Sequence, residues 1–477
     1  MLYFSAEMAS LIENITGKRI PKEEVTKPSA FKAYRRNNAN VGTETEALLL
    51  YLDMNSFFAT CEQQANEELR GKPVGVITHD SPYSCVIAPS IEAKKFGVKT
   101  GMRLNECRVL CPGIIPVLTH PPYYRRVHVK VMEILRRYCD DVLAKSIDEA
   151  VANFTSYRMV YKDITAIAQQ IKEDIRKEYD YLRCSIGIAP NTFLAKLGTE
   201  LQKPDGLIQI SPDNIDHYLA KLQLQDLPGI ASRNARRLEM IGIKTPLQMR
   251  HASEALLRKA FGGVVGNYWH RRLNFAEVDQ YSNGLNRTMS AMRTVSREQR
   301  ESKQALESLL VSLCTRLEQR MVKMDVFCKE ASFFIRYRNN TGWDTKIRFT
   351  QPVQDAVELR YYILDRIREF EGSGNKSMFN NNTLSMGVGV QGFVLGGNLQ
   401  YSLFDNRIMQ DKVRKVMYHI KDKYGKNTVR KGAELFNPHV MRDAIGFGSV
   451  KDMVMLRDDD TGDEYVRNQY LLEDDDY

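Results

Sequence analysis

The stretch ALLLYLDMNSFFATCE (Ala47–Glu62) joins an apolar run, an acid and a helix start within sixteen residues. The run Ala47–Met54 is short, apolar and stops at Asp53, which predicts a buried strand. Asn55 or Ser56 can cap a helix that begins directly after it. The free amides at such a helix N-terminus attract phosphate. The stretch therefore predicts a strand that carries an acid to the edge of an anion site.

A second acidic site lies in KSIDEAV (Lys145–Val151), where Asp148 and Glu149 are predicted to end another half-buried strand. Neighbouring strand residues point to opposite faces, so one of the two acids must lie on the core side or at a bend. If Asp53 joins them, unpaired burial of three carboxylates costs on the order of several kcal/mol. Mg²⁺ suits carboxylate oxygens and removes this repulsion. The alternative is that these acids are caps or ion-pair partners at strand ends.

The residues after Phe154 predict an alternation of helix and strand. Ile164–Ile175 has the spacing of an amphipathic helix, and Leu182–Ala189 alternates as a strand does. Pro190–Leu201 is a predicted helix that Asn191 can cap. We therefore expect an α+β sheet layer with helices on one face.

The second half of the chain predicts two further units. Residues 212 to 285 are helical and interrupted by glycines. Beyond Arg287 the pattern is βαββαβ, with a helix around Leu306–Leu317 and another around Val357–Leu364. Four basic residues alternate along two of its predicted strands, so one face of that sheet should be basic. They are Arg336, Arg338, Lys346 and Arg348.

The bulk composition is that of a multidomain globular protein. A chain of 477 residues is expected to form two to four domains. It has no apolar run of about 18 residues and no signal-peptide pattern, so we expect a cytoplasmic protein without a membrane partner. Eight cysteines at irregular spacing match no zinc template and predict reduced, mostly buried thiols.

The charge is distributed unevenly along the chain. The formal net charge is +9, but Asp458–Tyr477 has nine acids and one Arg, which leaves +17 for residues 1–457. A basic body suggests a polyanionic partner such as nucleic acid. The segment Asp226–Ile243 resembles a helix–hairpin–helix, whose hairpin amides hold a backbone phosphate without reading sequence. Its candidate DNA contacts are Pro228, Gly229, Ile230 and Arg233.

Several motifs together resemble the Y-family translesion DNA polymerases. They are YLDMNSFFATCE, CVIAPSIEAKKFGVKTGM, KSIDEA, CSIGIAPNTFLAKLGTELQKPDGL and LPGI, in that order. The likeness spans residues 47–396 and is nearest to the UmuC and UvrX-like bacterial branch of the ImpB/MucB/SamB family. It implies a right-hand polymerase with a ferredoxin-like palm (47–56 and 107–211), fingers (57–106), a helix–hairpin–helix thumb (212–286) and a βαββαβ little finger (287–396).

The resemblance assigns the metal site. Asp53, Asp148 and Glu149 look like ligands of two Mg²⁺ ions, which Mn²⁺ can replace, and the carbonyl of Met54 is an expected further ligand. Such a pair of ions, ~3.5–4 Å apart, stabilises phosphoryl transfer.

The resemblance also assigns the nucleotide site. Phe58 looks like the steric gate that excludes a ribose 2′-OH, and Phe57 lies beside the triphosphate. Lys94 and Lys203 look like triphosphate clamps, although Lys94 stands where many relatives have Arg. Ile91 stands where DinB-type members often have a Tyr that binds triphosphate, so one phosphate contact is in doubt.

The implied activity is DNA-dependent DNA synthesis past lesions in damage tolerance and the SOS response, on primer–template DNA with dNTPs. QYSLF resembles the peptide that docks bacterial polymerases on the sliding clamp, through Gln400, Leu403 and Phe404. Accessory SOS proteins are further possible partners. Residues 1–46 are an N-terminal extension and residues 397–477 a C-terminal tail, neither with an assigned role beyond the clamp peptide. Two alternatives are a catalytically silent scaffold of this family and another palm-type enzyme such as a nucleotidyl cyclase.

Overall fold

The computed structural model describes residues 47–279, 288–374, 377–400, 407–425, 428–429 and 431–432. The chain divides into two compact units, with the boundary between Asp279 and Gln280. The first contains the predicted palm, fingers and thumb, and the second contains the predicted little finger. Each is described by itself below.

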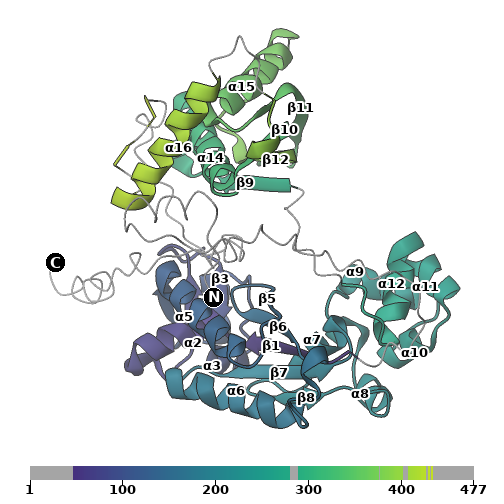
Figure 1. The fold of residues 1–477 in the computed structure, drawn as a ribbon. Helices are drawn as coiled ribbons and strands as arrows, with labels where there is room; N and C mark the ends of the chain where they lie inside the picture. The colour runs from purple at the N-terminus through teal and green to yellow at the C-terminus, as the bar shows by residue number, and fades with distance from the viewer. Residues whose placement is uncertain are drawn as a thin grey trace, which may run out of the picture. The chain divides into compact units, whose positions relative to one another are not determined.

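The region predicted as the palm contains a five-stranded sheet with β1 (Leu49–Met54) at its centre (Figure 1). The strand order is β5 (Val142–Ala144), β6 (Glu149–Asn153), β1, β7 (Cys184–Ala189) and β8 (Leu207–Gln209). β1 runs antiparallel to both of its neighbours, and β7 pairs in parallel with β8. The predicted strands at residues 47–54 and 182–189 are confirmed.

Alternation along β1 divides its side chains between two faces of the sheet. Leu50, Leu52 and Met54 join the palm core, which helices α2, α5 and α6 also supply. The other face carries Tyr51 and Asp53, and it is covered by α7. The bounds of these helices are α2 Phe57–Ala65, α5 Pro121–Arg136, α6 Ile164–Glu178 and α7 Thr192–Leu201.

The position of α7 corrects the prediction that helices lie on one face only. A Cβ on Gly187 of β7 would meet the carbonyl oxygen of Ala195 at 1.9 Å, so α7 packs directly on the sheet backbone. Asn191 caps this helix as predicted, because its side chain accepts from the Leu194 amide at 2.8 Å. The close approach brings side chains of α7 to the face that carries Asp53.

The fingers contain a three-stranded sheet of order β3 (Val86–Pro89), β2 (Val74–Ile77) and β4 (Ile115–Leu118). β4 pairs in parallel with β2, so this sheet continues past residue 106, where the fingers were predicted to end. Two helices accompany it, α3 (Ile91–Lys95) and α4 (Leu104–Leu110).

The thumb is helical, as predicted. Its helices are α8 (Ile215–Leu219), α9 (Ser232–Glu239), α10 (Pro246–His251), α11 (Glu254–Phe261) and α12 (Gly263–Leu273). Short 3₁₀ turns lie at η3 (Glu67–Leu69) and η4 (Thr155–Tyr157) in the palm and fingers and at η5 (Leu224–Asp226) before α9.

The second unit confirms the βαββαβ pattern. A four-stranded antiparallel sheet has the order β11 (Gly342–Val353), β10 (Val326–Tyr337), β12 (Thr383–Leu395) and β9 (Thr288–Thr294). Its core is shared with α14 (Lys303–Lys323) and α15 (Ala356–Gly372). The predicted helix around Val357–Leu364 is confirmed as α15, and Val357 and Tyr361 lie on its exposed side. The short elements are α13 (Arg297–Arg300) and η6 (Gly396–Asn398).

One helix lies beyond the predicted little finger. α16 (Arg407–Tyr424) belongs to the second unit and contacts α14. Residues assigned by sequence to the tail therefore extend this domain.

Two bulk predictions can be checked in the described residues. All eight cysteines are free thiols there, and seven of them are buried, as predicted. None of the helices in the described ranges is long and apolar enough to cross a membrane.

Candidate active site

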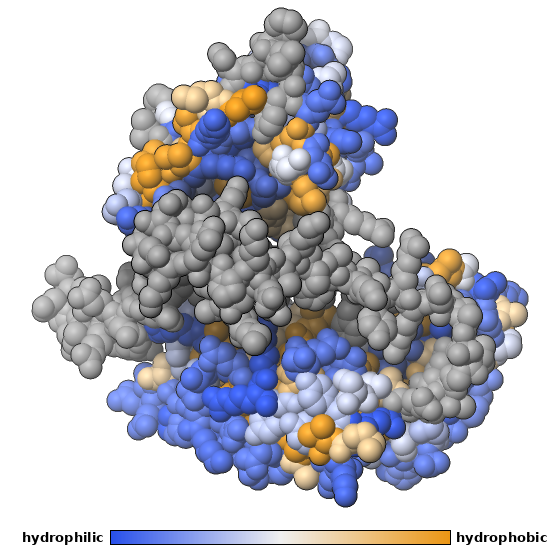
Figure 2. All heavy atoms as spheres, viewed as in Figure 1, coloured by the Kyte–Doolittle hydropathy of each residue, from blue (hydrophilic) through white to orange (hydrophobic). Residues whose placement is uncertain are grey.

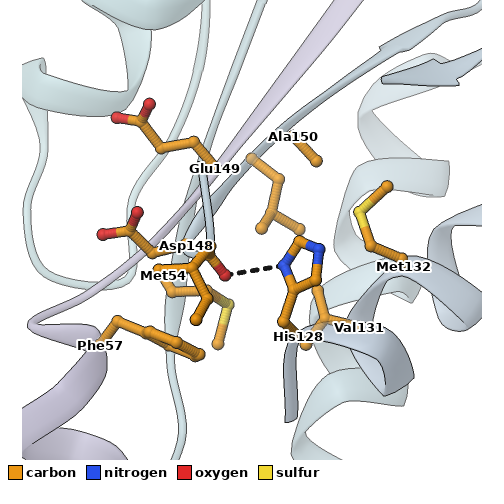
Figure 3. Close-up of a pocket in the computed structure, with 10 residues that line it drawn as sticks. Met54, Phe57, His128, Val131, Met132, Asp148, Glu149 and Ala150 are labelled. Atoms are coloured by element: carbon orange, nitrogen blue, oxygen red, sulfur yellow. Dashed lines mark hydrogen bonds between the residues drawn. The ribbon is translucent and has the colours of Figure 1, made fainter. Parts of the chain in front are cut away.

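The three predicted acids meet where β1 and β6 lie side by side. Asp53 pairs directly with Glu149 in the antiparallel register, so both side chains leave the same face of the sheet. Asp148 lies in the bend directly before β6, which confirms the bend predicted from the sequence as one alternative, whereas Glu149 begins β6 and does not end a strand. The bend frees Asp148 from strand alternation, and in Figure 3 its carboxylate points to the same side as that of Glu149. The Met54 amide donates to the Asp148 carbonyl at 2.9 Å and ties the bend to β1.

Lys196 of α7 bridges the acids. Its ammonium contacts Asp53 Oδ2, lies 2.7 Å from Glu149 Oε1 and 2.9 Å from Glu200 Oε1. It also lies 5.3 Å from the ring centre of Tyr51, whose hydroxyl donates to Glu149 Oε2 at 2.9 Å. Burial lowers the pKa of Lys196, but the charges of Asp53 and Glu149 outweigh it, so the net shift is upward.

The acids differ in their protonation behaviour. Burial, followed by the charges of Glu149 and Asp53, raises the pKa of Asp148 against the opposing hydrogen bond from Ser146. Burial also raises the pKa of Glu149, but the ion pair with Lys196 outweighs it and the net shift is downward. Asp148 is therefore the acid whose negative charge is least compensated in this arrangement.

The two predicted clamps approach the same acids. Lys203 Nζ lies 3.1 Å from Asp53 Oδ1 and 2.9 Å from Glu200 Oε1. Lys94 is exposed, yet partial desolvation and then repulsion by Lys203 lower its pKa, while Asp53 opposes the shift. Lys203 thus contacts Asp53 directly, and the charges of Lys203 and Asp53 both influence the pKa of Lys94.

The start of α2 differs from its predicted capping. Asn55 does not cap the helix: its side chain donates to Ser185 Oγ at 3.0 Å and accepts from the Asp205 amide at 2.7 Å. Ser56 occupies the cap position with φ of 50°, and its hydroxyl makes no capping hydrogen bond. Asn55 is buried. Instead of capping α2, its side chain connects β7 to the loop that contains Lys203.

Both adjacent phenylalanines of α2 are buried. Phe57 lines a small pocket with Asp148 and His128 (Figure 3). The Phe58 ring lies 4.6 Å from the ring of Tyr124, centre to centre, and is 6% exposed. Tyr124 donates to the fully buried Glu62, which also lies 2.9 Å from His120 Nδ1. Phe58 therefore packs against the ring of Tyr124, which is held in place by its hydrogen bond to Glu62.

The donor chemistry of the site fits a hard divalent cation. Three carboxylates here (Asp53, Glu149, Glu200) form ion pairs with two ammonium groups. Burial, followed by the charges of Glu149 and Asp53, raises the pKa of Asp148 beside them. Among the described residues no three acidic, histidine or cysteine side chains form a ready coordination sphere. Lys196 instead occupies the position between Asp53 and Glu149. A divalent cation at these acids would therefore replace the bridge that Lys196 makes.

The candidate DNA contacts of the thumb differ in accessibility. Gly229 has φ of +88° in the turn before α9 and is exposed, as is Arg233, while Pro228 is half-buried. Ile230 is buried, and its amide donates to the Leu227 carbonyl at 2.9 Å. Ile230 is thus part of the hairpin's support, and neither its side chain nor its amide is available to DNA.

The four basic residues predicted on the sheet of the second unit all face solvent. Lys346 and Arg348 of β11 lie opposite Ser332 and Glu330, and Arg336 belongs to the same face of β10. Arg348 pairs with Glu330 at 3.0 Å, and Arg336 pairs with Asp344 at 2.8 Å. Arg338, also exposed, follows the end of β10. The predicted basic face is present but carries acids as well.

The clamp peptide is only partly covered. Gln400 is exposed, while Leu403 and Phe404 lie outside the described residues.

Sequence reasoning missed four residues of the site: Lys196, Glu200, Tyr51 and His128. Lys196 and Glu200 are four residues apart, one helical turn of α7, and this spacing could have indicated that both lie on the same face of the helix. Tyr51 lies two residues before Asp53 on β1, so the sequence could have predicted that both side chains lie on the same face of the sheet. His128 donates from Nδ1 to the Ile147 carbonyl at 2.8 Å, directly before Asp148 (Figure 3), and no sequence signal pointed to it.

Comparison with known protein families agrees with this geometry. Residues 52–200 match the impB/mucB/samB family, and residues 286–403 match the impB/mucB/samB family C-terminal domain. The first match contains Asp53, Asp148, Glu149, Lys94 and Lys196, and together the two matches span more than half of the chain. The chain belongs to the impB/mucB/samB family.

Individual relatives of this impB/mucB/samB family member carry the name DNA polymerase IV. The protein of Bacteroides fragilis is 36% identical over 219 residues, which are 46% of this chain and 60% of the relative. That of Enterobacter sp. is 29% identical over 276 residues, 58% of this chain and 78% of the relative. The chain thus matches about three fifths of the length of the first of these relatives.

The fold of the family member agrees with that of a solved structure. A Y-family DNA polymerase chimera of Dbh and Dpo4 matches with a TM-score of 0.62 at 22% identity, over 73% of this chain and 99% of the chimera. The chain therefore has the Y-family polymerase fold, as the sequence predicted.

Proposed function

We propose that the chain is a DNA-dependent DNA polymerase that extends primers past damaged template bases. The observation that carries the proposal is the pairing of Asp53 with Glu149 across β1 and β6, with Asp148 in the adjoining bend and Lys203 within 3.1 Å of Asp53. Carboxylates beside cationic side chains suit the transfer of a nucleotide from a triphosphate. Family membership and the polymerase fold support the same reaction.

The metal ligands in this proposal are the carboxylates of Asp53, Asp148 and Glu149 and the carbonyl of Met54. Two Mg²⁺ ions, or Mn²⁺, would supply charge neutralisation at the α-phosphate and activation of the primer 3′-OH. The register between β1 and β6 positions two of the carboxylates on one face before any ligand arrives. The bend at Asp148 brings the third to the same side (Figure 3).

Protein side chains would hold the nucleotide. Lys203 and Lys94 bind the triphosphate as two point charges, since neither offers the fork of an arginine. Phe58, backed by Tyr124, packs against the deoxyribose and leaves no room for a 2′-OH. The 3′-oxygen of the primer attacks the α-phosphorus and pyrophosphate leaves, so one dNMP is added in each cycle.

Duplex DNA would be held through its phosphates. Gly229 and Arg233 of the thumb, and Arg336, Lys346 and Arg348 of the second unit, are exposed and suited to that contact. Binding of this kind is largely independent of sequence and weakens with salt. Docking on the sliding clamp through Gln400, Leu403 and Phe404 is part of the proposal and follows from the QYSLF motif alone.

Primer extension with the Asp148→Ala variant tests the reaction. The wild type should extend a primed template in Mg²⁺, and the variant should lose activity by at least about a hundredfold. Asp213→Ala, which removes an exposed acid of the same unit, is the matched control and should retain activity. Equal extension by wild type and Asp148→Ala would refute the catalytic assignment.

DNA binding at low salt separates the remaining alternatives. A silent scaffold would bind primed DNA without extending it, with or without Asp148. A palm-type enzyme of another class, such as a nucleotidyl cyclase, would not bind it.

A further inference from the structure

Helix α16 buries a mainly polar face, unlike an ordinary surface helix. It buries Asp411, Arg414, Tyr418 and Lys421, which recur at helical spacing on one face. Amphipathic helices normally bury their apolar face instead. On the opposite face, exposed apolar side chains form what is called here the α16 stripe. The stripe consists of Met409, Val413 and Val416, which are 65%, 56% and 59% exposed.

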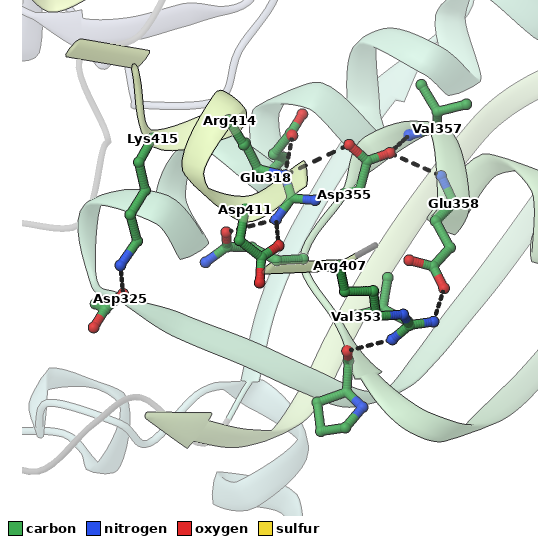
Figure 4. Close-up of polar contacts among 12 residues, drawn as sticks. Glu318, Asp325, Val353, Asp355, Val357, Glu358, Arg407, Asp411, Arg414 and Lys415 are labelled. Atoms are coloured by element: carbon green, nitrogen blue, oxygen red, sulfur yellow. Dashed lines mark hydrogen bonds and ion pairs between the residues drawn. The ribbon is translucent and has the colours of Figure 1, made fainter. Parts of the chain in front are cut away.

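A buried ion network fixes this orientation (Figure 4). Arg414 Nε lies 3.1 Å from Oε1 of Glu318, a side chain of α14 that is fully buried. Arg414 Nη1 donates to Asp411 at 2.7 Å and to Gln354 at 3.1 Å. Rotation of α16 to bury its stripe would withdraw Arg414 from Glu318. The loss of one partner of a buried ion pair costs about 3–5 kcal/mol, so the stripe is held toward solvent.

The stripe is an apolar surface rimmed by positive charge. In Figure 2, orange spheres follow the edge of the second unit where Figure 1 draws α16. Lys412, Lys415 and Lys423 are exposed beside the stripe, and Lys415 also contacts Asp325 at 2.9 Å. Apolar patches with a polar rim mark interaction sites. A second copy of this helix would bring lysines against lysines, so an acidic occupant is favoured.

The same chain contains an acidic segment of suitable chemistry. Asp458–Tyr477 has nine acids and one Arg, and its acids form two groups, at residues 458–464 and 473–476. Between the two groups the segment contains five apolar or aromatic residues. They are Tyr465, Val466, Tyr470, Leu471 and Leu472. An apolar centre between acidic ends is complementary to an apolar stripe beside lysines.

The chain length allows this contact. Lys431 lies 2.7 Å from Glu318, so the chain is still attached to the second unit at that point. The 25 residues from 433 to 457 can span up to roughly 80 Å when extended, which exceeds the length of α16. No partner from outside the chain is required.

We propose that the α16 stripe is the docking surface for Asp458–Tyr477 of the same chain. The apolar side chains of the segment cover Met409, Val413 and Val416, and its acids pair with Lys412 and Lys423. Because the ionic part is exposed, salt weakens the contact. The inference concerns a different surface from the polymerase site, so it stands or falls independently of the proposed activity.

Photo-crosslinking in the full-length protein tests the docking. A benzoylphenylalanine replaces Val413, and the adducts are located by mass spectrometry. The matched control carries the same group at Tyr361, which is 58% exposed on α15. We expect crosslinks from position 413 to Asp458–Tyr477 within one chain, at least fivefold above those from position 361. About 0.5 M NaCl or the added change Val416→Asp should reduce the yield severalfold.

Each other outcome overturns the proposal. Crosslinks between two chains would assign the stripe to self-association. Crosslinks confined to residues 433–457, or a yield no higher than from position 361, would show that the acidic segment does not dock there. Both labelled positions are exposed, so neither replacement removes core packing.

Discussion

The ammonium of Lys196 lies 2.7 Å from Glu149 and also contacts Asp53, so a helix side chain joins the two acids that face each other across β1 and β6. Lys196 is 18% exposed, and Asp53 is nearly buried. The lysine therefore compensates charge that the strands would otherwise hold at a high cost. The Lys196 ammonium lies where the proposed metal ions would bind. The stability of the protein should therefore depend both on Lys196 and on the metal ions.

The first prediction is that Lys196→Met makes folding depend more strongly on Mg²⁺. Without the lysine, Asp53 and Glu149 repel each other, and the free energy of unfolding in EDTA should fall by roughly 3 kcal/mol. Added Mg²⁺ should then raise the melting temperature more in the variant than in the wild type, because the ion no longer competes with an ammonium group. Differential scanning fluorimetry in EDTA and in Mg²⁺ measures both effects.

Lys177→Met provides the control for that measurement. Lys177 is 71% exposed and pairs with Asp174 on α6, away from the acids of β1 and β6. Its loss should change stability by less than about 1 kcal/mol. If Mg²⁺ stabilises Lys196→Met no more than wild type, the competition between lysine and metal is disproved.

The second prediction concerns sugar selection. Phe58→Ala should raise the incorporation of ribonucleotides relative to deoxynucleotides by at least about tenfold, because the ring proposed to exclude the 2′-OH is gone. Single-nucleotide insertion with dNTP and rNTP measures the ratio. Tyr124→Phe keeps the ring that backs Phe58 but removes the hydroxyl bonded to Glu62, so its effect should be smaller. Unchanged discrimination in Phe58→Ala would contradict the gate role.

Some strands and helices were predictable because each has the periodicity of its own structure, but the short strands β2, β3, β4, β5 and β8 were not predicted. β1, β7 and the βαββαβ unit follow local apolar patterns that burial reinforces. The faces of the helices were harder. The contact of α7 with the sheet depends on Gly187 having no side chain, a tertiary feature that strand periodicity does not contain. Similarly, Val357 resembles a core residue by spacing but lies outside on α15.

The candidate site was predictable in its residue types and less so in its geometry. Asp53, Asp148 and Glu149 were identified because acids at the ends of apolar runs are conspicuous, and motif resemblance added Lys94 and Lys203. Lys196 was missed because a single lysine in an amphipathic helix resembles a solvated surface residue. Only the register between strands and the close packing of α7 show that it faces the acids.

The third prediction is a pH dependence that originates at His128. Burial lowers the pKa of this histidine below its ordinary value of about 6.5, with a smaller opposing effect from its bond to the Ile147 carbonyl. The unfolded chain therefore binds a proton that the folded protein excludes. Stability is complete above about pH 6.5 and falls as the pH drops below it, by no more than about 1.4 kcal/mol per pH unit.

Asn at this position tests that assignment. His128→Asn can keep a donor near the Ile147 carbonyl but cannot titrate, so its stability should fall less between pH 7 and pH 5.5. Urea denaturation across that range gives the two profiles. Parallel profiles for wild type and variant would show that other groups cause the acid dependence.

The fourth prediction compares two arginines of the same helix. Arg414→Met removes a cation from the fully buried Glu318 and leaves it with Lys431, so the free energy of unfolding of the second unit should fall by about 3 kcal/mol. Arg407→Met removes a partner of Glu358 in a pair whose side chains are 25% and 29% exposed, and should cost less than about 1 kcal/mol. Hydrogen exchange of the α14 amides, measured in the full chain, gives the loss of stability of the second unit in each variant. Equal losses of stability in the two variants would mean that the buried Arg414–Glu318 pair does not set the orientation of α16. The exposure of the α16 stripe would then need another explanation.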